Sequence, residues 1–178
     1  MTTYPVPEEL RSERLRLISM TPTFIQAVLE GRYEEADGLL GIVIPRDWPG
    51  GDDRYLHLWH KDMIDAPEFA KWRARVIVPI EGDVHMVGHA GFHGPPNENG
   101  MVEMGYTIFP EFRGRRFATE VAQRLIDFAK ENGAKLIRAS VSPDNAPSLA
   151  MTRTLGLVQI GEQMDEIDGL ELVFERPL

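Results

Sequence analysis

The chain has 178 residues, of which 43% are hydrophobic and 26% are charged, as in an ordinary soluble globular protein. Its formal net charge of −9 argues against a nucleic-acid-binding protein, because phosphate contacts need a basic surface, and it favours cationic or amine-bearing partners. The sequence contains no cysteine, which excludes disulfide bonds, a thiolate nucleophile and a cysteine-ligated metal site. A length of 178 residues suits a single domain, so we expect one domain over residues 1–178.

Hydropathy and the N-terminal segment favour a cytoplasmic protein. No apolar run approaches the roughly 18 residues that a membrane-spanning helix needs, so no membrane association is expected. The first residues, MTTYPVPEELRSERLRL, lack the basic segment and apolar stretch that mark a signal peptide. The sequence leaves open whether the protein is a monomer or a homodimer.

The first half of the chain predicts one strand, three helices and a β-hairpin. Arg14 to Met20 alternates polar and apolar residues, which is typical of a strand. Thr21 is typical of a helix N-cap and Pro22 of the first helical position, so a helix is predicted to extend to Gly31. The other predicted elements are a helix over Glu34–Leu40, a loop over 41–51 with Ile42, Val43, Ile44 or Trp48 buried, a helix after Asp52-Asp53, and strands Trp72–Ile80 and Val84–Phe92 around the turn Glu81-Gly82-Asp83. The third helix has six predicted apolar positions, which are Tyr55, Leu56, Leu58, Trp59, Met63 and Ile64.

The central stretch from Met101 to Gly133 predicts a strand, a turn and a helix. Apolar residues alternate with polar or small ones from Val102 to Ile108, and Pro110 ends the strand. Beyond the turn, apolar residues recur at helical spacing from Val121 to Ala129, and Asn132-Gly133 supplies a C-terminal stop.

The turn between this strand and helix, Arg113 to Thr119, combines three arginines with one glycine. The first N–H groups of a helix point outward near the positive end of its dipole, so such a turn is suited to an anion. Gly114 leaves the backbone open to a phosphate, and the arginines add positive charge to an acidic protein. The alternative is a solvated basic turn that only caps the helix.

The remainder of the chain predicts a strand, a short helix and a final hairpin. Their bounds are Leu136–Val141 for the strand, Ala146–Leu155 for the helix, and Leu157–Met164 and Leu170–Glu175 for two strands around the turn Ile167-Asp168-Gly169. In chain order the elements are β-α-α-α-β-β-β-α-β-α-β-β. This order predicts an α/β (α+β) protein with a mixed sheet and helices on both faces.

The arginine-rich turn also carries a family resemblance. Arg113-x-x-Arg116-x-Ala118 resembles motif A of the GCN5-related N-acetyltransferases (the GNAT superfamily), whose pattern is Q/R-x-x-G-x-G/A. In that family, backbone amides of this motif hold the pyrophosphate of acetyl-CoA. Arg116 stands where the pattern has its central glycine, and an arginine does not allow the bare backbone approach that glycine does.

Further motifs in the same order extend the resemblance from Val87 to Phe174. Asn145-x-x-Ser148, followed by Leu155-Gly156-Leu157, resembles the N-x-x-S-x(6)-L-G-F segment of the family, with leucine in place of phenylalanine. The RimJ/RimL-like branch shares the motifs found here as Gly94-Pro95-Pro96, Glu103-Met104-Gly105-Tyr106 and Arg113-Gly114 through Ala118-Thr119-Glu120. The resemblance implies the GNAT fold, with a mixed, mostly antiparallel central sheet, and an N-acetyltransferase activity.

The resemblance also implies roles for particular residues. An acetyl group would move directly from acetyl-CoA to a primary amine, either of a small molecule or of a protein N-terminus. The implied catalytic residues are Glu103, as the base that removes the amine proton, and Ser148, as a donor to the sulfur. The implied cofactor-binding residues are Thr107, Ile108 and Phe109 through their backbone, and Arg113, Gly114, Arg115, Arg116, Phe117, Ala118, Thr119 and Asn145. The helix after Asn145 lacks the tyrosine that many members use as a general acid, so reprotonation by Ser148 or water is a hypothesis.

These roles have plainer alternatives. Glu103 can be an ion-paired carboxylate of a half-exposed strand, Ser148 a packing residue and Asn145 an N-cap. Because Arg116 replaces glycine and the helix lacks a tyrosine, a non-catalytic acyl-CoA-binding sensor or scaffold is the main rival function. A structural domain whose basic turn binds anions incidentally is the second rival.

Histidines and acidic residues add weaker candidates. His85, His89 and His93 lie four apart on one predicted strand, about 13 Å between neighbours at ~3.3 Å per residue, so one metal ion cannot bridge them. No metal is expected, and a base at His89 or His93 is an alternative to Glu103. In the fold that the resemblance implies, Trp48 lies in a loop that borders the cleft for the acetyl acceptor. Three acidic residues near Trp48 could attract a cationic acceptor or simply start a helix, namely Asp47, Asp52 and Asp53.

Overall fold

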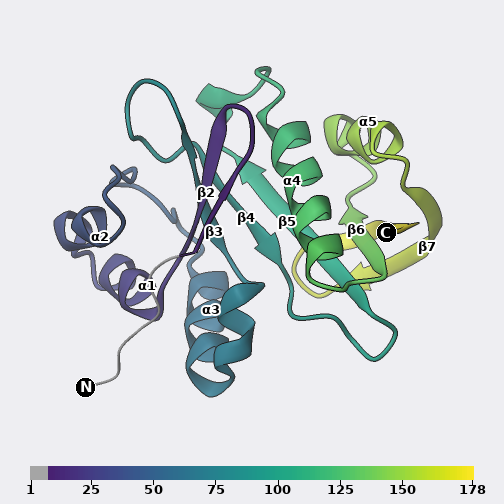
Figure 1. Ribbon diagram of the computed structural model, residues 1–178, viewed down its shortest axis with the longest axis horizontal. Helices are drawn as coiled ribbons and strands as arrows, with labels where there is room; N and C mark the ends of the chain where they lie inside the picture. The colour runs from purple at the N-terminus through teal and green to yellow at the C-terminus, as the bar shows by residue number, and fades with distance from the viewer. Residues whose placement is uncertain (1–7) are drawn as a thin grey trace.

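The computed structural model describes residues 8–178 as one eight-stranded sheet with helices against both of its faces (Figure 1). This arrangement confirms the predicted sheet with helices on both sides. Residues 1–7, which begin the segment examined for a signal peptide, lie outside the described residues. Within the described part of the chain, none of the helices has the length and apolar character needed to cross a membrane.

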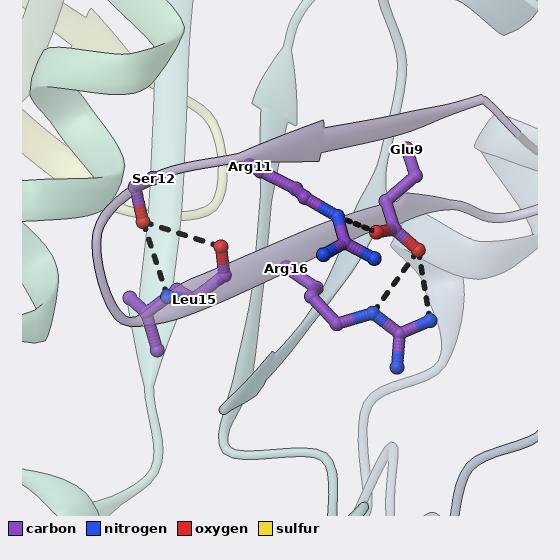
Figure 2. Close-up of polar contacts among 5 residues, drawn as sticks. All are labelled: Glu9, Arg11, Ser12, Leu15 and Arg16. Atoms are coloured by element: carbon purple, nitrogen blue, oxygen red, sulfur yellow. Dashed lines mark hydrogen bonds and ion pairs between the residues drawn. The ribbon is translucent and has the colours of Figure 1, made fainter. Parts of the chain in front are cut away.

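The N-terminal elements follow the predicted order, with one strand that the sequence did not predict. They are β1 (Glu9–Arg11), β2 (Leu15–Ser19), α1 (Pro22–Leu29), α2 (Tyr33–Leu40), α3 (Arg54–Asp65) and the 3-10 helix η1 (Pro67–Lys71). Thr21 caps α1 as predicted, since its hydroxyl accepts a hydrogen bond from the Phe24 N–H at 3.1 Å. The short β1 pairs with β2, and Glu9 forms one ion pair with Arg11 on its own strand and another with Arg16 across the hairpin (Figure 2).

The predicted hairpin has shorter strands than the sequence suggested. Its strands are β3 (Arg75–Pro79) and β4 (Gly88–Phe92), and Ile80 to Val87 connects them instead of a three-residue turn. His85 lies in this connection and bridges to Val43, so the prediction that it shares a strand with His89 is wrong. The reason is that Val43 takes backbone hydrogen bonds of this segment that a longer hairpin would have used.

The C-terminal elements lie close to their predicted bounds. They are β5 (Met101–Ile108), the 3-10 helix η2 (Pro110–Phe112), α4 (Phe117–Glu131), β6 (Leu136–Val141), α5 (Ala146–Thr154), β7 (Val158–Asp165) and β8 (Gly169–Pro177). The strand order is β1-β2-β3-β4-β5-β6-β8-β7. Only β5 and β6 pair in parallel among the described strands, and the other neighbouring pairs are antiparallel. The sheet is therefore mixed and mostly antiparallel.

Buried side chains form two clusters, one on each face of the sheet. One cluster packs α4 and α5 against the sheet, and the other packs α1, α2 and α3 against the opposite face (Figure 1). The loop over 41–51 contributes Ile42, Ile44 and Trp48 to the second cluster, as predicted. The predicted apolar positions Leu58 and Ile64 of α3 are instead 52% and 51% exposed, because this helix turns other residues to the sheet.

Strands β5 and β6 stay paired over only part of their lengths. Their parallel register covers Met101–Glu103 and Leu136–Arg138, whereas β4 stays paired with β5 as far as Ile108. In the described part of the chain, no strand therefore pairs with the β6-facing edge of the second half of β5. Backbone N–H groups along that edge need other partners. The candidate active site lies at this gap in the sheet.

Candidate active site

A cleft of about 920 Å³ opens between the second half of β5, the start of α4 and the start of α5. It brings together ten of the thirteen predicted site residues, which are Thr107, Ile108, Arg113, Gly114, Arg116, Phe117, Ala118, Thr119, Asn145 and Ser148. Glu103 and Phe109 do not line this cleft, and Arg115 lines a neighbouring cavity of about 680 Å³. Tyr106, which belongs to a family motif but was not among the predicted site residues, also lines the cleft.

The start of α4 has the features of an anion site. No side chain caps the helix, and the Glu120 N–H donates to the Arg116 carbonyl. The N–H groups before Glu120 belong to the first turn of α4, where no carbonyl of the same helix accepts from them. They also lie at the positive end of the helix dipole. Gly114 has a φ of 76°, and nothing lies within 4 Å of the place a β-carbon would take. The backbone of the turn is therefore accessible from the cleft.

The conformation of Arg116 explains how the turn forms without the glycine of the family pattern. Its φ of 62° lies in the left-handed region, and among residues 8–178 it is the one non-glycine residue with a positive φ. An L-residue in this region costs roughly 1–2 kcal/mol, whereas glycine adopts it freely. Arg116 therefore follows a backbone path that favours glycine and adds strain to the turn.

The turn between β1 and β2 contacts the start of α4. Glu120 accepts hydrogen bonds from the Ser12 hydroxyl at 2.6 Å and the Arg14 N–H at 2.7 Å. Arg14 also donates to the Arg115 carbonyl at 3.1 Å, and its guanidinium lies over the Phe117 ring. Burial raises the pKa of the Glu120 carboxyl, but the hydrogen bonds from Ser12 and Arg14 outweigh it, so this pKa lies below its usual value. Sequence reasoning missed these contacts because Ser12 and Glu120 lie 108 positions apart.

Backbone N–H groups of Thr107, Ile108 and Phe109 were predicted to face the cofactor. Of these three, the Ile108 N–H alone points toward the cleft. The Phe109 N–H donates to the Val87 carbonyl at 3.0 Å, so the prediction that it is available to the cofactor is wrong. Antiparallel alternation directs the Thr107 N–H toward β4 as well, and the Ile108 N–H toward the gap beside β6. The Ile108 carbonyl accepts a hydrogen bond from Arg113 Nε at 3.1 Å, which ties the end of β5 to the arginine-rich turn.

Two hydroxyl groups meet at the start of α5. Asn145 is the N-cap of this helix, because its side-chain oxygen accepts a hydrogen bond from the Ser148 N–H at 3.2 Å. The Tyr106 hydroxyl donates to Ser148 Oγ at 2.9 Å. Burial raises the pKa of the Tyr106 phenol. Sequence reasoning sought a tyrosine on α5 and missed this one, although the motif Glu103-x-x-Tyr106 contains it.

Glu103 points away from α4. Its neighbours Val102 and Met104 are buried against that helix, so strand alternation turns Glu103 to the other face of the sheet. The carboxylate is 16% exposed, accepts a hydrogen bond from the Ser140 hydroxyl at 2.6 Å and lies 3.8 Å from His93 Nδ1. Glu103 is therefore held in a polar network outside the cleft.

Five ring-bearing side chains, here called the aromatic cluster, gather on the α3 side of β4 and β5: Trp48, Tyr55, Trp59, His89 and Phe109. The His89 ring centre lies 6.0 Å from that of Trp48, 5.6 Å from Tyr55 and 5.7 Å from Trp59. Burial lowers the pKa of His89 to about 4, so its imidazole is neutral at pH 7. His89 faces Thr107 in the β4–β5 register, which places it beside the end of the cleft.

Two of the acidic residues predicted to attract a cationic acceptor already have basic neighbours. Asp52 accepts hydrogen bonds from the Arg54 guanidinium at 2.8 and 2.6 Å, and these bonds lower the pKa of Asp52 to about 2. The Asp53 carboxylate lies 3.6 Å from His57 Nε2. The charge of Asp52 is therefore largely compensated, which weakens the prediction for this residue.

Comparison with known sequences identifies the family. A family model described as "Acetyltransferase (GNAT) domain" matches residues 27–158. A Bacillus subtilis (strain 168) protein named "Uncharacterized N-acetyltransferase YjdG" is 27% identical over 150 residues, which are 84% of this chain and 89% of that protein.

Solved structures share the fold. A putative ribosomal-protein-serine acetyltransferase from Vibrio cholerae has a TM-score of 0.67 at 14% identity, covering 96% of this chain and 98% of that one. A spermidine N-acetyltransferase chimera of Vibrio cholerae SpeG and hSSAT has a TM-score of 0.64 at 16% identity, covering 92% and 95%. These likenesses confirm the predicted GNAT fold. Because the family model covers most of the chain, the protein belongs to the GNAT family, RimJ/RimL-like branch, and is an acetyl-CoA-dependent N-acetyltransferase.

Proposed function

We propose that the enzyme holds acetyl-CoA in the cleft between β5 and β6 and transfers the acetyl group directly to a primary amine. The observation that carries this proposal is the uncapped start of α4, which opens onto a cleft that also contains Ile108 and Ser148. Partners for a pyrophosphate, a thioester carbonyl and a sulfur thus line one cleft. Acetyl-CoA carries all three of these groups.

The residues of the cleft fit this cofactor. The N–H groups of Phe117 to Thr119, together with the guanidinium groups of Arg113 and Arg116, suit a pyrophosphate. The unpaired edge of β5 suits an extended chain with amide groups, because such a chain can bond to a free strand edge. The Ile108 N–H is then placed to donate to the thioester carbonyl as negative charge develops on its oxygen.

We propose Glu103 as the base that removes the amine proton, acting through a chain of hydrogen-bonded water molecules. Glu103 lies four residues before Thr107, ~13 Å along the strand at ~3.3 Å per residue, so its carboxylate does not touch an amine held near Ile108. His89 lies closer, opposite Thr107, but a pKa of about 4 makes it a weak base at neutral pH. We therefore propose Glu103, rather than His89, as the base.

Glu103→Gln tests this role, with Glu98→Gln in an exposed loop as the matched control. The Glu103 variant is expected to lower kcat about 100-fold, the usual contribution of a general base, with acetyl-CoA affinity unchanged. The Glu98 variant is expected to match the wild type. Unchanged turnover in Glu103→Gln would move the role to His89 or to water alone.

The proposed acceptor is a primary amine, of a small molecule or of a protein N-terminus. The shared fold includes a ribosomal-protein acetyltransferase and a spermidine acetyltransferase, and it supports both types equally. The rival interpretation, a non-catalytic sensor, was based on Arg116 in place of glycine and on the lack of a tyrosine on α5, and neither observation favours it now. Arg116 keeps a turn that opens to the cleft, and Tyr106 brings a tyrosine hydroxyl to Ser148.

The proposal is tested by calorimetric titration with acetyl-CoA, followed by a free-thiol assay with candidate amines. Spermidine and short peptides with free N-termini are the test acceptors, and the same peptides with blocked N-termini are the controls. Binding of acetyl-CoA and thiol release that depends on a free amine are expected. Binding without release from any amine would contradict the proposed acceptor class, and absence of binding would contradict the proposed cleft.

A further inference from the structure

The hydrogen bond between Tyr106 and Ser148 links β5 to α5 across the cleft. Tyr106 lies beyond the part of β5 that pairs with β6, and Ser148 lies in the first turn of α5, 42 positions later. Their hydroxyl oxygens are 2.9 Å apart. Both residues line the cleft, and Tyr106 also packs against the buried cluster under α4, which restricts its ring.

The hydrogens of these two hydroxyl groups determine what the contact does. A hydroxyl has one hydrogen to donate and two lone pairs to accept with. Tyr106 donates its hydrogen to Ser148 Oγ, so Ser148 keeps its own hydrogen for a different partner. The backbone of Ser148 is fixed separately, because its N–H donates to the Asn145 side chain. A Ser148 hydroxyl held in this way can donate into the cleft.

We propose that Tyr106 is a positioning residue for Ser148, the residue that the family resemblance already implies as the proton donor to the departing sulfur of CoA. This inference rests on the proposed function, since it needs acetyl-CoA in the cleft. The acceptor nitrogen forms its bond to the thioester carbon, the carbon–sulfur bond breaks, and the electron pair of that bond stays on sulfur. Ser148 passes its proton to the sulfur and takes one from Tyr106, which regains a proton from solvent.

The surroundings of the pair suit this task. Because burial raises the pKa of Tyr106 above that of an ordinary phenol, near 10, the hydroxyl stays protonated across the neutral range. It can therefore donate to Ser148 at every stage before the sulfur leaves. The missing tyrosine of α5 is in this way replaced by a serine on that helix and a tyrosine on the neighbouring strand.

A purely structural bond between β5 and α5 makes a different prediction. Loss of such a bond would loosen the cleft for every CoA-like ligand, whether or not the ligand contains sulfur. Loss of a sulfur-directed donor affects only ligands that carry the sulfur. Desulfo-CoA, which lacks this atom, therefore separates the two roles in a binding measurement that needs no turnover.

The experiment measures calorimetric binding of CoA and desulfo-CoA to the wild type and to Tyr106→Phe, Ser148→Ala, Ser148→Thr and the double variant Tyr106→Phe/Ser148→Ala. Turnover with acetyl-CoA is measured on the same samples. Tyr33→Phe is the matched control, because the Tyr33 hydroxyl donates to the Trp48 carbonyl at 3.0 Å and lines no part of the cleft. Ser148→Thr keeps the hydroxyl and checks that the helix start tolerates substitution.

CoA is expected to bind about 5- to 10-fold more weakly to Tyr106→Phe and Ser148→Ala, the usual effect of one hydrogen bond. Desulfo-CoA is expected to bind all variants equally. Turnover should fall about 100-fold in Ser148→Ala, and Tyr106→Phe should lower kcat with little change in the KM for acetyl-CoA. The double variant should be no slower than Ser148→Ala, because both residues serve one donor. Ser148→Thr should recover most of the lost turnover.

Three results would overturn this inference: equal weakening for both ligands, additive losses in the double variant, or wild-type turnover in Tyr106→Phe. Failure of the proposed function would look different. In that case the wild type itself would bind neither CoA nor acetyl-CoA, whereas failure of the inference alone leaves wild-type binding and turnover intact.

Discussion

The cleft beside β5 and the aromatic cluster on the other face of the sheet are built in different ways. The cleft takes most of its lining from two short segments, residues 112–119 and 142–151, and offers backbone N–H groups at the start of a helix. The aromatic cluster takes five side chains from four separate segments. A site made of backbone tolerates a changed side chain, as at Arg116, whereas a site made of side chains depends on each residue.

Gly114→Val is expected to have the largest effect, because it places a branched side chain on the backbone of the cleft. The acetyl-CoA Kd should rise at least about 100-fold, equal to about 2.7 kcal/mol, as measured by calorimetry. Gly82→Val is the matched control, since Gly82 also has a positive φ, of 90°, with open surroundings in the β3–β4 connection. If both variants lost affinity equally, backbone strain rather than access to the cleft would be the cause.

His89→Phe tests the aromatic cluster through the pH dependence of stability. Burial lowers the pKa of His89 to about 4 in the folded protein, below about 6.5 in the unfolded chain. The unfolded state therefore binds the proton more readily, so this contribution to stability is full above pH 6.5 and falls as the pH drops toward 4. Between pH 7 and 4.5 the free energy of unfolding should fall by about 2 kcal/mol more in the wild type than in the variant, as urea unfolding would show.

His93→Phe is the control for this measurement, because the His93 side chain is 65% exposed. It should keep the wild-type dependence on pH. The same dependence in His89→Phe and the wild type would mean that His89 is not held neutral by the aromatic cluster.

Glu120→Gln tests the contact between the β1–β2 turn and the start of α4. The variant is expected to lose about 1–2 kcal/mol of unfolding free energy at pH 7, because Ser12 and Arg14 bond to a charged acceptor. The pKa of Glu120 is lowered on folding, so this stabilisation is full above about pH 4.5 and is lost as the pH falls further. Urea unfolding at pH 7 and pH 3 measures the difference, with Glu111→Gln at an exposed position as the control. A constant gap between the two proteins at both pH values would contradict this assignment.

Arg116 offers the smallest and most local test. Arg116→Gly should be more stable than Arg116→Ala by about 1 kcal/mol, because alanine keeps the strain of the left-handed backbone and glycine removes it. At an ordinary helical position the order is reversed, since glycine destabilises relative to alanine. Thermal unfolding of the two variants gives the sign directly, and greater stability of the alanine variant would mean that the turn takes another path.

Features with a local signal were predictable from the sequence. The Thr21 cap, the extent of α4 and the turn from Arg113 to Thr119 follow from spacing and residue type within a few positions. The strand β1 was missed because three residues are too short to show a period and are held by pairing with β2. The length of the β3–β4 hairpin was misjudged because Val43, about 40 positions earlier, takes backbone hydrogen bonds from it.

The family, the order of the elements and the position of the turn from Arg113 to Thr119 could be predicted from the sequence, because each follows from motifs and patterns of residues that are close along the chain. The contact of Tyr106 with Ser148, the bond of Glu120 to Ser12 and the use of the Phe109 N–H by the Val87 carbonyl are visible only in the folded structure. Such contacts join residues from different elements and leave no periodic signal, since packing of the whole sheet and its helices sets which side chains meet.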